Sequence, residues 1–245
     1  TSYFKRVNKL RKEIKKREID LVYSLLVGPN LLNALSTFAG SGCGIIWGNR
    51  VSSFGTYQFG FKGVLASLAS KILVIRANLI IANSHAGKRH LERNGIRQSK
   101  IVVIPNGIDV SRFFPNQEFR EEFRTKLRVG KEQIVIGQVG RVVEWKGHDV
   151  FLRAAARLKK INPQVVFVFI GDGEPLWLSQ LRDLADELGI IDSLHWLDAS
   201  RNIEYALNGI DILTVSSTSG EGFPNIIGEA MATSTAIVAT DVGEN

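Results

Sequence analysis

The sequence predicts an α/β fold made of two domains, each a parallel sheet covered by helices. Short apolar segments alternate with amphipathic helical segments along most of the 245 residues, a pattern typical of parallel sheets buried on both faces. Pro105-Asn106-Gly107 interrupts this alternation, and both proline and Asn-Gly favour turns. We place the linker there, running to Pro115, and expect domains at residues 1–110 and 111–245.

The first domain is expected to be the less regular one. Its predicted strands are 20–26, 44–47, 79–82 and 101–104, and its predicted helices are 4–18, 30–38, 62–76 and 86–94. The second domain alternates more regularly. Its predicted strands are 134–140, 165–170, 194–197, 212–216 and 236–240, and its predicted helices lie near 148–161, 175–188, 202–208 and 225–232.

The charges divide unevenly between the two halves. Residues 1–115 contain 18 Lys and Arg against 5 Asp and Glu, a net charge of +13, whereas residues 116–245 carry −6, which leaves +7 overall. This asymmetry indicates two different surfaces, one of them drawn to an anionic partner. Charge alone fits nucleic acid and anionic lipid headgroups. For the first twenty residues, peripheral contact with an anionic membrane and a solvated helix face are equal alternatives. No nucleic acid is expected as a partner.

The composition indicates a globular chain in a reducing compartment. The apolar and charged fractions, 44% and 22%, are ordinary for folded domains. The single cysteine, Cys43, excludes an internal disulfide and a cysteine-based metal cluster. Lys71 and Arg76 interrupt the most apolar region of the sequence. This region is therefore shorter than the run of about 18 consecutive apolar residues that indicates a transmembrane helix. We expect a cytoplasmic protein, with contact at the inner face of the plasma membrane as the alternative.

The ends of the sequence suggest a fragment. The chain begins with Thr1, its only methionine is Met231, and it stops at Asn245 directly after a predicted strand. We expect it to have been cut at both ends.

Two cations follow the first strand of the second domain. Gly140 allows a tight turn after that strand, and Arg141 and Lys146 then lie on one loop before a helix. A planar guanidinium and a compact ammonium beyond a strand's end suit a diphosphate or triphosphate. The alternative is a pair of solvated surface cations. His148 and Asp149 are interpreted as helix-capping groups rather than catalysts.

Two further loops are candidates for the same crevice. Gly171-Asp172-Gly173 follows a buried strand and by itself is as often a turn as a nucleotide contact, and the spacing lacks a full dinucleotide fingerprint. Residues 219–229 open as a loop and enter a helix near Pro224, where outward N–H groups suit an anion.

Two carboxylates flank that helix start. Glu229 can accept hydrogen bonds from a vicinal diol such as ribose, and Glu221 precedes the helix, where sugar hydroxyls would project. Taken alone, Glu221 would be interpreted as an acidic group that interacts favourably with the dipole of the helix near its first turn, and Glu229 as a surface residue. No group of His, Asp and Glu has metal-ligand spacing, and no Walker motif or Gly-x-Ser-x-Gly elbow is present.

Together these motifs resemble the retaining glycosyltransferases with two Rossmann-like domains (GT-B), specifically family 4. The Glu-x7-Glu signature matches Glu221 and Glu229 around GFPNIIG. Gly140-Arg141 with Lys146-Gly147, Gly171-Asp172-Gly173 and the IPNGID linker follow in the family's order. The resemblance covers nearly the whole chain and is weakest over residues 1–45.

The resemblance implies transfer of a sugar from a nucleotide-diphosphate donor to an acceptor hydroxyl of a glycan or lipid-linked acceptor, with retained configuration. Polysaccharide, glycolipid or cell-envelope glycan synthesis is the implied context. Arg141 and Lys146 would hold the diphosphate, Glu229 the ribose and Glu221 the transferred sugar. The donor-binding site would be completed by Gly140, Gly171, Gly173, Gly222, Phe223, Pro224 and Asn225. The family needs no metal or cofactor for this step.

The sequence departs from the family in two ways. The family's first strand and glycine-rich loop would precede residue 1, and the helices that close its second domain would follow residue 245, so the chain itself is expected to bind donor poorly and to be slow or inactive. A histidine that many relatives carry after the strand matching GIIW is missing, which leaves Asn49 and Arg50 as acceptor-side candidates. A GT-B epimerase or phosphorylase and a non-catalytic nucleotide-sugar or lipid-binding module are the rival functions.

Overall fold

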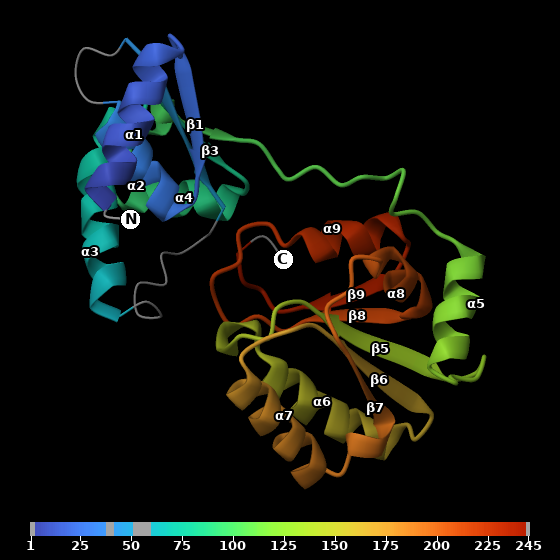
Figure 1. Ribbon diagram of the computed structural model, residues 1–245. Coiled ribbons are helices and arrows are strands. Elements are labelled where there is room, and N and C mark those ends of the chain that lie inside the picture. The colour runs from blue at the N-terminus through green and yellow to red at the C-terminus, as the bar shows by residue number, and fades with distance from the viewer. Residues whose placement is uncertain (1–2, 38–41, 51–59, 244–245) are drawn as a thin grey trace. The chain divides into compact units, whose positions relative to one another are not determined.

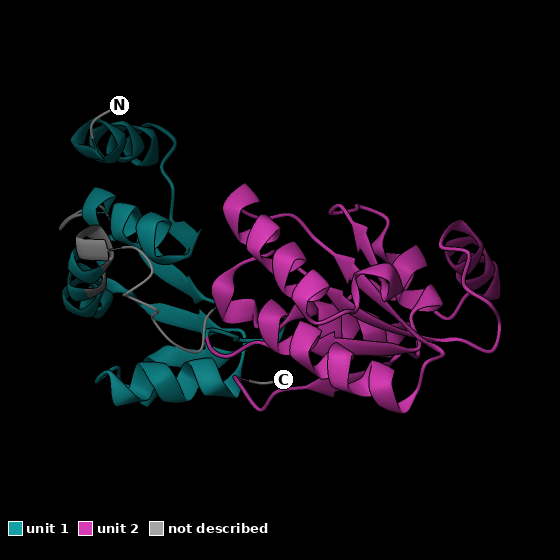
Figure 2. Cartoon of the chain, turned by 90° about the horizontal axis from the view of Figure 1, so that it is seen from below, with its two compact units in different colours: residues 1–106, 220–223, 244 teal, residues 107–219, 224–243, 245 magenta. Residues whose placement is uncertain are grey.

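The computed structural model describes residues 3–37, 42–50 and 60–243, without the side chains of residues 60–63 and 67. These residues form two compact units (Figure 2). The first holds the chain up to Asn106 together with residues 220–223, and the second holds residues 107–219 and 224–243. The predicted helix end at Phe38 and the two chain ends lie outside the described residues.

The first unit is a four-stranded parallel sheet in the order β1-β2-β3-β4 (Figure 1). Its strands are β1 (Leu21–Leu25), β2 (Gly44–Asn49), β3 (Leu79–Ala82) and β4 (Ile101–Val103). Its helices are α1 (Tyr3–Lys16), α2 (Val27–Ser36), α3 (Gly60–Leu73) and α4 (His85–Arg93), with 3-10 turns at η2 (Val74–Arg76) and η3 (Gln98–Lys100). The strands are too far apart in sequence to form hairpins, and each pair is joined by a helix, which makes the sheet parallel.

The core of the first unit lies on one face of this sheet. Alternation along the strands sends Trp47 and Ile80 to the same side as Ala34 of α2 and Leu91 of α4, where all four are buried. Tyr23 of β1, in contrast, is 50% exposed.

The second unit is a five-stranded parallel sheet in the order β7-β6-β5-β8-β9. Its strands are β5 (Ile134–Val139), β6 (Val165–Ile170), β7 (Leu194–Leu197), β8 (Ile212–Val215) and β9 (Ala236–Ala239). Its helices are α5 (Gln117–Lys126), α6 (His148–Ile161), α7 (Pro175–Glu187), α8 (Ile203–Gly209) and α9 (Asn225–Ala232), with 3-10 turns at η4 (Glu144–Lys146) and η5 (Ile191–Ser193). The chain starts in the middle of the sheet at β5, runs outward to β7, and then returns to build β8 and β9 on the other side. The strand order therefore reverses between β5 and β8.

Helices cover both faces of this second sheet, as β6 shows. All six residues of β6 are buried. Phe167 and Phe169 pack toward α6 and α7, and Val168 and Ile170 pack toward α5 and α8. The predicted doubly covered parallel sheet is confirmed in this unit.

The predicted elements differ from the observed ones mainly at one helix. Ranges predicted for β3, α6, β6, β7 and α9 coincide with the observed bounds, and the other predicted ranges differ by one to three residues at their ends. Helix α5 was not predicted, because it follows the expected linker and its sequence QEFREEFRTK is mostly polar. Its place in the fold depends on long-range contacts that a local pattern does not contain.

None of the helices that the structure describes combines the length and the hydropathy needed to cross a bilayer.

Candidate functional site

The reversal of strand order in the second unit fixes where a ligand site is expected. In doubly wound sheets, ligands bind beyond the carboxyl ends of the strands at the point where the order reverses. Here β5 and β8 are neighbours, with Gln138 paired to Thr214 near their ends. The loop after β5 and the loop after β8 therefore leave the sheet side by side.

Hydrogen bonds join these two loops directly. The Ser216 hydroxyl donates to the Gly147 carbonyl at 2.7 Å, and the Thr218 N–H donates to the Trp145 carbonyl at 2.8 Å. The Gln138 amide donates to the Lys146 carbonyl at 3.0 Å from within β5. The Ser216 hydroxyl also lies 3.2 Å from the Lys146 carbonyl, so three successive carbonyls of the lysine-bearing turn contact the segment that leads toward α9.

Gly147 makes this close approach possible. Its φ is +62°, a left-handed conformation that favours glycine. A Cβ at this position would collide with the Ser216 carbonyl oxygen. Sequence reasoning noted Gly147 only as part of the family motif, and the required contact is visible only in the fold.

The predicted glycines at the ends of β5 and β6 hold a second pair of loops together. The Val142 N–H donates to the Asp172 carbonyl at 2.8 Å. A Cβ on Gly171 would strike the Gly140 carbonyl oxygen, and one on Gly173 would strike the Val142 carbonyl oxygen. Gly171 and Gly173 therefore have a packing role, whether or not a ligand touches them. Gly140 has open space around its Cα.

The two predicted cations lie on this anchored loop. The Arg141 side chain is exposed, and it makes no hydrogen bond or ion pair with the part of the chain that the structure describes. Lys146 is half-buried, with its Nζ 4.8 Å from the centre of the Trp145 ring. A guanidinium and an ammonium from one loop beside the switch point suit an anionic ligand.

Helix α9 begins where the sequence predicted. Pro224 occupies the N-cap position in an extended conformation, and no side chain caps the helix there. Asn225 is exposed at the first helical position. The N-terminus of α9 therefore presents a partial positive charge without a side-chain cap.

Glu229 lies on α9 near charges that the sequence analysis did not connect with it. It is half-buried, and burial raises the pKa of its carboxyl group; Arg112 lowers that pKa and Glu204 raises it. Arg112 donates from Nε and from its terminal nitrogen to Oε2 of Glu204, at 3.0 and 2.6 Å. Arg112 and Glu204 are distant in sequence from Glu229, so no local signal could have grouped them.

Glu221, Gly222 and Phe223 pack with the first unit rather than the second. Glu221 is 5% exposed. The Asn106 amide donates to the Phe223 carbonyl at 3.1 Å, and a Cβ on Gly222 would lie 2.6 Å from Oδ1 of Asn83. This grouping differs from the sequence interpretation, which placed the whole Glu221 loop in the second domain.

The acceptor-side candidates of the first unit also have protein partners. Asn49 is buried at the end of β2, and its carbonyl accepts from the Asn83 N–H at 3.2 Å. Arg50 donates to Oδ1 of Asn106 at 2.6 Å. Both residues therefore help to hold the loops of the first unit.

The capping interpretation of His148 and Asp149 is wrong. Gly147 is the N-cap residue of α6, and no side chain caps this helix. The His148 ring is 1% exposed and packs 4.8 Å from the Phe169 ring. Burial lowers the pKa of His148 to about 4, despite a hydrogen bond with the Val143 backbone that acts in the opposite direction. His148 is a neutral core residue beneath the cation loop.

The second unit has a hollow at the carboxyl ends of β6 and β7 and another near the amino ends of β8 and β9. One, of about 490 Å³, opens beyond Ile170 and Leu197 and includes Trp196 and Tyr205 in its wall. The other, of about 390 Å³, lies around Pro115 and Asp211. Arg141, Lys146 and Glu229 line neither of them. Within the described residues, no group of three His, Cys, Asp or Glu is placed to hold a metal ion.

Two parallel sheets with a cation-bearing switch point in the second define the class of protein as a GT-B glycosyltransferase fold. Solved structures agree with this assignment. The Anabaena protein Alr3699/HepE in complex with UDP-glucose has a TM-score of 0.83 and 24% identity, over 97% of this chain and 63% of that one. Sucrose-phosphate synthase from Thermosynechococcus elongatus has a TM-score of 0.84 and 18% identity, over 98% and 61%.

Family models identify the group within that class. The model of glycosyl transferases group 1 matches residues 119–245, more than half of the chain, and the model of Glycosyltransferase Family 4 matches residues 2–112. The chain therefore belongs to the glycosyl transferases group 1 family.

Curated relatives carry glycosyltransferase names. The D-inositol 3-phosphate glycosyltransferase of Thermobifida fusca is 34% identical over 183 residues, 70% of this chain and 41% of that protein. The protein of the same name from Stackebrandtia nassauensis is 33% identical over 156 residues, 59% and 34%. The chain spans less than two thirds of the length of each of these proteins and structures.

Proposed function

We propose that the protein is a retaining glycosyltransferase that moves a sugar from a nucleotide-diphosphate donor to an acceptor hydroxyl. Polysaccharide, glycolipid or cell-envelope glycan synthesis is the proposed context. The observation that carries the proposal is the pair of joined loops at the switch point, because it sets the Arg141 and Lys146 loop beside the segment that leads to α9.

The donor's diphosphate fits the charges of these loops. Its negative charge increases as the glycosidic bond breaks, and cations held in place beforehand stabilise that charge in the transition state. In the proposal, Arg141 and Lys146 neutralise the diphosphate together with the N-terminus of α9, and no metal or cofactor takes part. Glu229 accepts hydrogen bonds from the ribose, and Glu221, Gly222 and Phe223 serve the transferred sugar.

The relatives support a nucleotide-sugar donor. The Anabaena neighbour has been solved with UDP-glucose, and the Thermobifida and Stackebrandtia relatives are named for transfer to an inositol phosphate. For this chain we propose a UDP-sugar as the first donor to test. The acceptor is proposed to be a hydroxyl of a glycan or a lipid-linked sugar.

Replacement of Lys146 tests this function. We expect Lys146→Ala to lower kcat/KM for sugar transfer by about 100-fold or more, the usual effect of removing one charge-stabilising donor. Lys131→Ala is the matched control, because Lys131 is an exposed lysine of the same unit that lies before β5, at the opposite end of that strand from the loop. Equal rates for the two variants would contradict the donor site.

A donor-only incubation separates transfer from the rival chemistry. A transferase leaves the donor's sugar unchanged until an acceptor is added, apart from slow hydrolysis. Formation of an isomeric nucleotide sugar without acceptor would assign an epimerase instead.

Chelation of divalent metals tests the metal-independent step. We expect the transfer rate to stay unchanged, and a loss of rate that added metal restores would contradict this part of the proposal.

A further inference from the structure

The first unit carries an exposed apolar stripe on α3 and the turn that follows it. Leu65, Leu68, Ile72 and Ile75 follow one another at spacings of three, four and three residues, which places them on one face of a helix. Their exposed fractions are 59%, 53%, 72% and 77%. Aligned apolar side chains with this exposure are unusual on a soluble surface and mark an interaction site.

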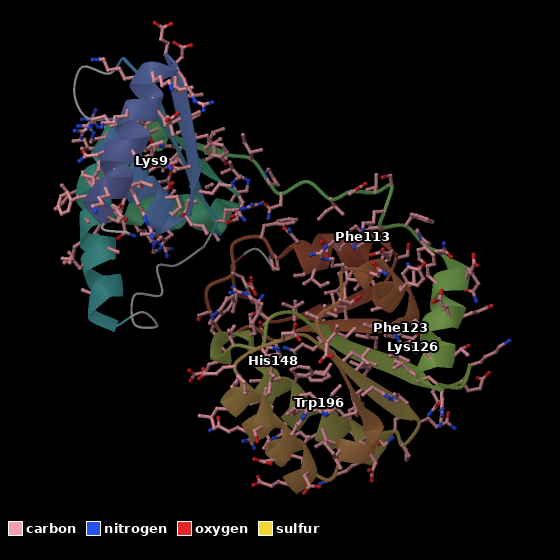
Figure 3. All side chains as sticks on the ribbon, viewed as in Figure 1. Lys9, Phe113, Phe123, Lys126, His148 and Trp196 are labelled. Atoms are coloured by element: carbon pink, nitrogen blue, oxygen red, sulfur yellow. The ribbon has the colours of Figure 1, made fainter. Side chains whose placement is uncertain are left out.

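A stripe of lysines follows helix α1 of the same unit. Val7 and Ile14 are the buried residues of this helix, and Lys5, Lys9, Lys12 and Lys16 recur on the opposite face at spacings of four, three and four. All four lysines are exposed, and Figure 3 labels Lys9 among them. At the start of the same helix, Phe4 is 79% exposed.

The two stripes belong to one cationic body. Helices α1 and α3 both contact α2, so they flank a common neighbour. Residues 21–91 contain no Asp or Glu, although they include exposed cations such as Lys71, which lies beside the apolar stripe. Little acidic charge is therefore present to weaken attraction to an anionic surface.

We propose that the first unit docks on an anionic lipid bilayer. The apolar stripe of α3 enters the boundary between headgroups and acyl chains, and the lysines of α1 attract the anionic headgroups across the surrounding water. Combined apolar burial and electrostatic attraction is how helices lying in the membrane interface bind. This docking surface lies in the first unit and does not involve the loops of the proposed donor site.

The chemistry of the surface favours lipid over two other occupants. Nucleic acid is held through its phosphates, and single strands also by stacking on aromatic side chains, so neither form gives a partner to the entirely aliphatic α3 stripe. A symmetric pair of copies would bring two strongly cationic bodies together, which opposes association.

Flotation of the protein with vesicles tests the proposal. We expect binding to vesicles of phosphatidylcholine mixed with phosphatidylserine, weak or no binding to phosphatidylcholine alone, and loss of binding as salt rises, because the Debye length falls from about 10 Å at 0.1 M to about 3 Å at 1 M. No binding to anionic vesicles at low salt would overturn the proposal.

Matched variants identify the surface. Changing Lys5, Lys9, Lys12 and Lys16 to Gln should weaken binding to anionic vesicles by about fivefold per lysine. The control changes four exposed cations of the second unit to Gln: Lys126, Lys131, Arg157 and Lys160. Net charge falls equally in both variants, so an equal loss in the control would show nonspecific attraction and overturn the proposal.

The apolar stripe has its own test. The double variant Leu68→Gln, Ile72→Gln should reduce the vesicle binding that persists at moderate salt. Its melting curve, followed by circular dichroism, should match that of the wild type, because both side chains are exposed. Unchanged vesicle binding in this variant would overturn the role of α3. A concentration-dependent dimer in light scattering that these substitutions abolish would assign the stripe to a second copy and overturn the lipid assignment.

Discussion

Gly147 combines a left-handed backbone with a contact that leaves no room for a side chain. Its carbonyl accepts from Ser216, and its neighbour Lys146 carries one of the two cations of the proposed donor site. A substitution there strains the backbone and also pushes apart the loops after β5 and β8. Gly189 has a similar φ of +68° with nothing within 4 Å of an added Cβ, so it isolates the effect of strain alone.

Gly147→Ala should therefore affect ligand binding as well as stability. We expect Gly189→Ala to lower the free energy of unfolding by about 1 kcal/mol, the cost of a left-handed alanine. Gly147→Ala should cost about 2 kcal/mol more, as overpacking does, and should weaken UDP binding at least tenfold. Urea unfolding and calorimetric titration measure the two effects. Equal stability and equal UDP affinity in both variants would contradict the importance of the loop contact.

His148 makes stability depend on pH. Its pKa is lowered from 6.5 to about 4 by burial, so the unfolded chain binds a proton below pH 6.5 that the folded chain does not bind until about pH 4. The contribution of His148 to the free energy of unfolding is therefore fully present above pH 6.5. About 3 kcal/mol of this free energy is lost as the pH falls from 6.5 to 4.

A ring that does not titrate should remove this loss. His148→Phe keeps an aromatic ring beside Phe169 and is expected to flatten the dependence of the free energy of unfolding on pH between 6.5 and 4. His195→Phe is the control. Because His195 is only partly buried, this substitution should leave most of the pH dependence of the free energy of unfolding in place. Urea unfolding across this pH range measures the slopes, and a wild-type slope in His148→Phe would refute the assignment.

At the scale of elements, α5 shows how a polar helix is held on a sheet. Phe123 and Leu127 enter the core beside Val168 and Ile170, and the Phe123 label in Figure 3 lies between α5 and the sheet. Arg124 is 6% exposed and donates to Asp211 at 3.0 Å. Asp211 also accepts from the Val135 N–H at 2.7 Å, at the start of the central strand.

Loss of Asp211 should therefore destabilise the second unit strongly. Asp211→Ala leaves the Arg124 guanidinium buried without its carboxylate, and we expect a loss of about 3–5 kcal/mol. Asp183→Ala, at an exposed position of α7, should change stability by less than about 0.5 kcal/mol. Chemical denaturation compares the two variants. A small loss for Asp211→Ala would mean that the carbonyls of Gly130 and Gln133, which Arg124 also contacts, are sufficient partners.

The elements also show which part of the fold a sequence can predict. Strand β6 is six consecutive apolar residues, and α6 carries apolar positions at helical spacing, so their bounds follow from local pattern. Helix α5 offers the same kind of signal only through Phe119, Phe123 and Leu127 among charged neighbours. Its two arginine anchors, Arg120 and Arg124, bind Asp211, which lies 87 or more residues away in sequence.

At the scale of the whole molecule, the chain consists of two units with separate hydrophobic cores. Among the residues that the structure describes, one core lies in the first unit around Ile80, and three lie in the second on the two faces of its sheet. The proposed diphosphate and ribose contacts are in the second unit, whereas the proposed membrane surface is in the first.

Hydrogen exchange should reveal this division. Saturating UDP is expected to slow amide exchange in residues 140–147 and in the first turn of α9, because a ligand that binds only the folded form suppresses opening of the segments that hold it. Exchange in β1 and β2 of the first unit should be unchanged. Mass spectrometry of the digested protein measures both, and protection centred on the hollow around Pro115 instead would contradict the proposed site.

The sequence by itself determined the class of fold, the parallel sheets and the three loops that carry the candidate residues. It did so because buried strands and amphipathic helices have local periodicity, and because Gly140, Arg141, Lys146 and Glu229 stand in a family motif of fixed order. Only the tertiary structure decided how these loops are held: Gly147 against Ser216, Gly171 against Gly140, and Glu229 near Arg112. These contacts join residues far apart in the chain, and their short distances depend on how the strands are ordered in the sheet.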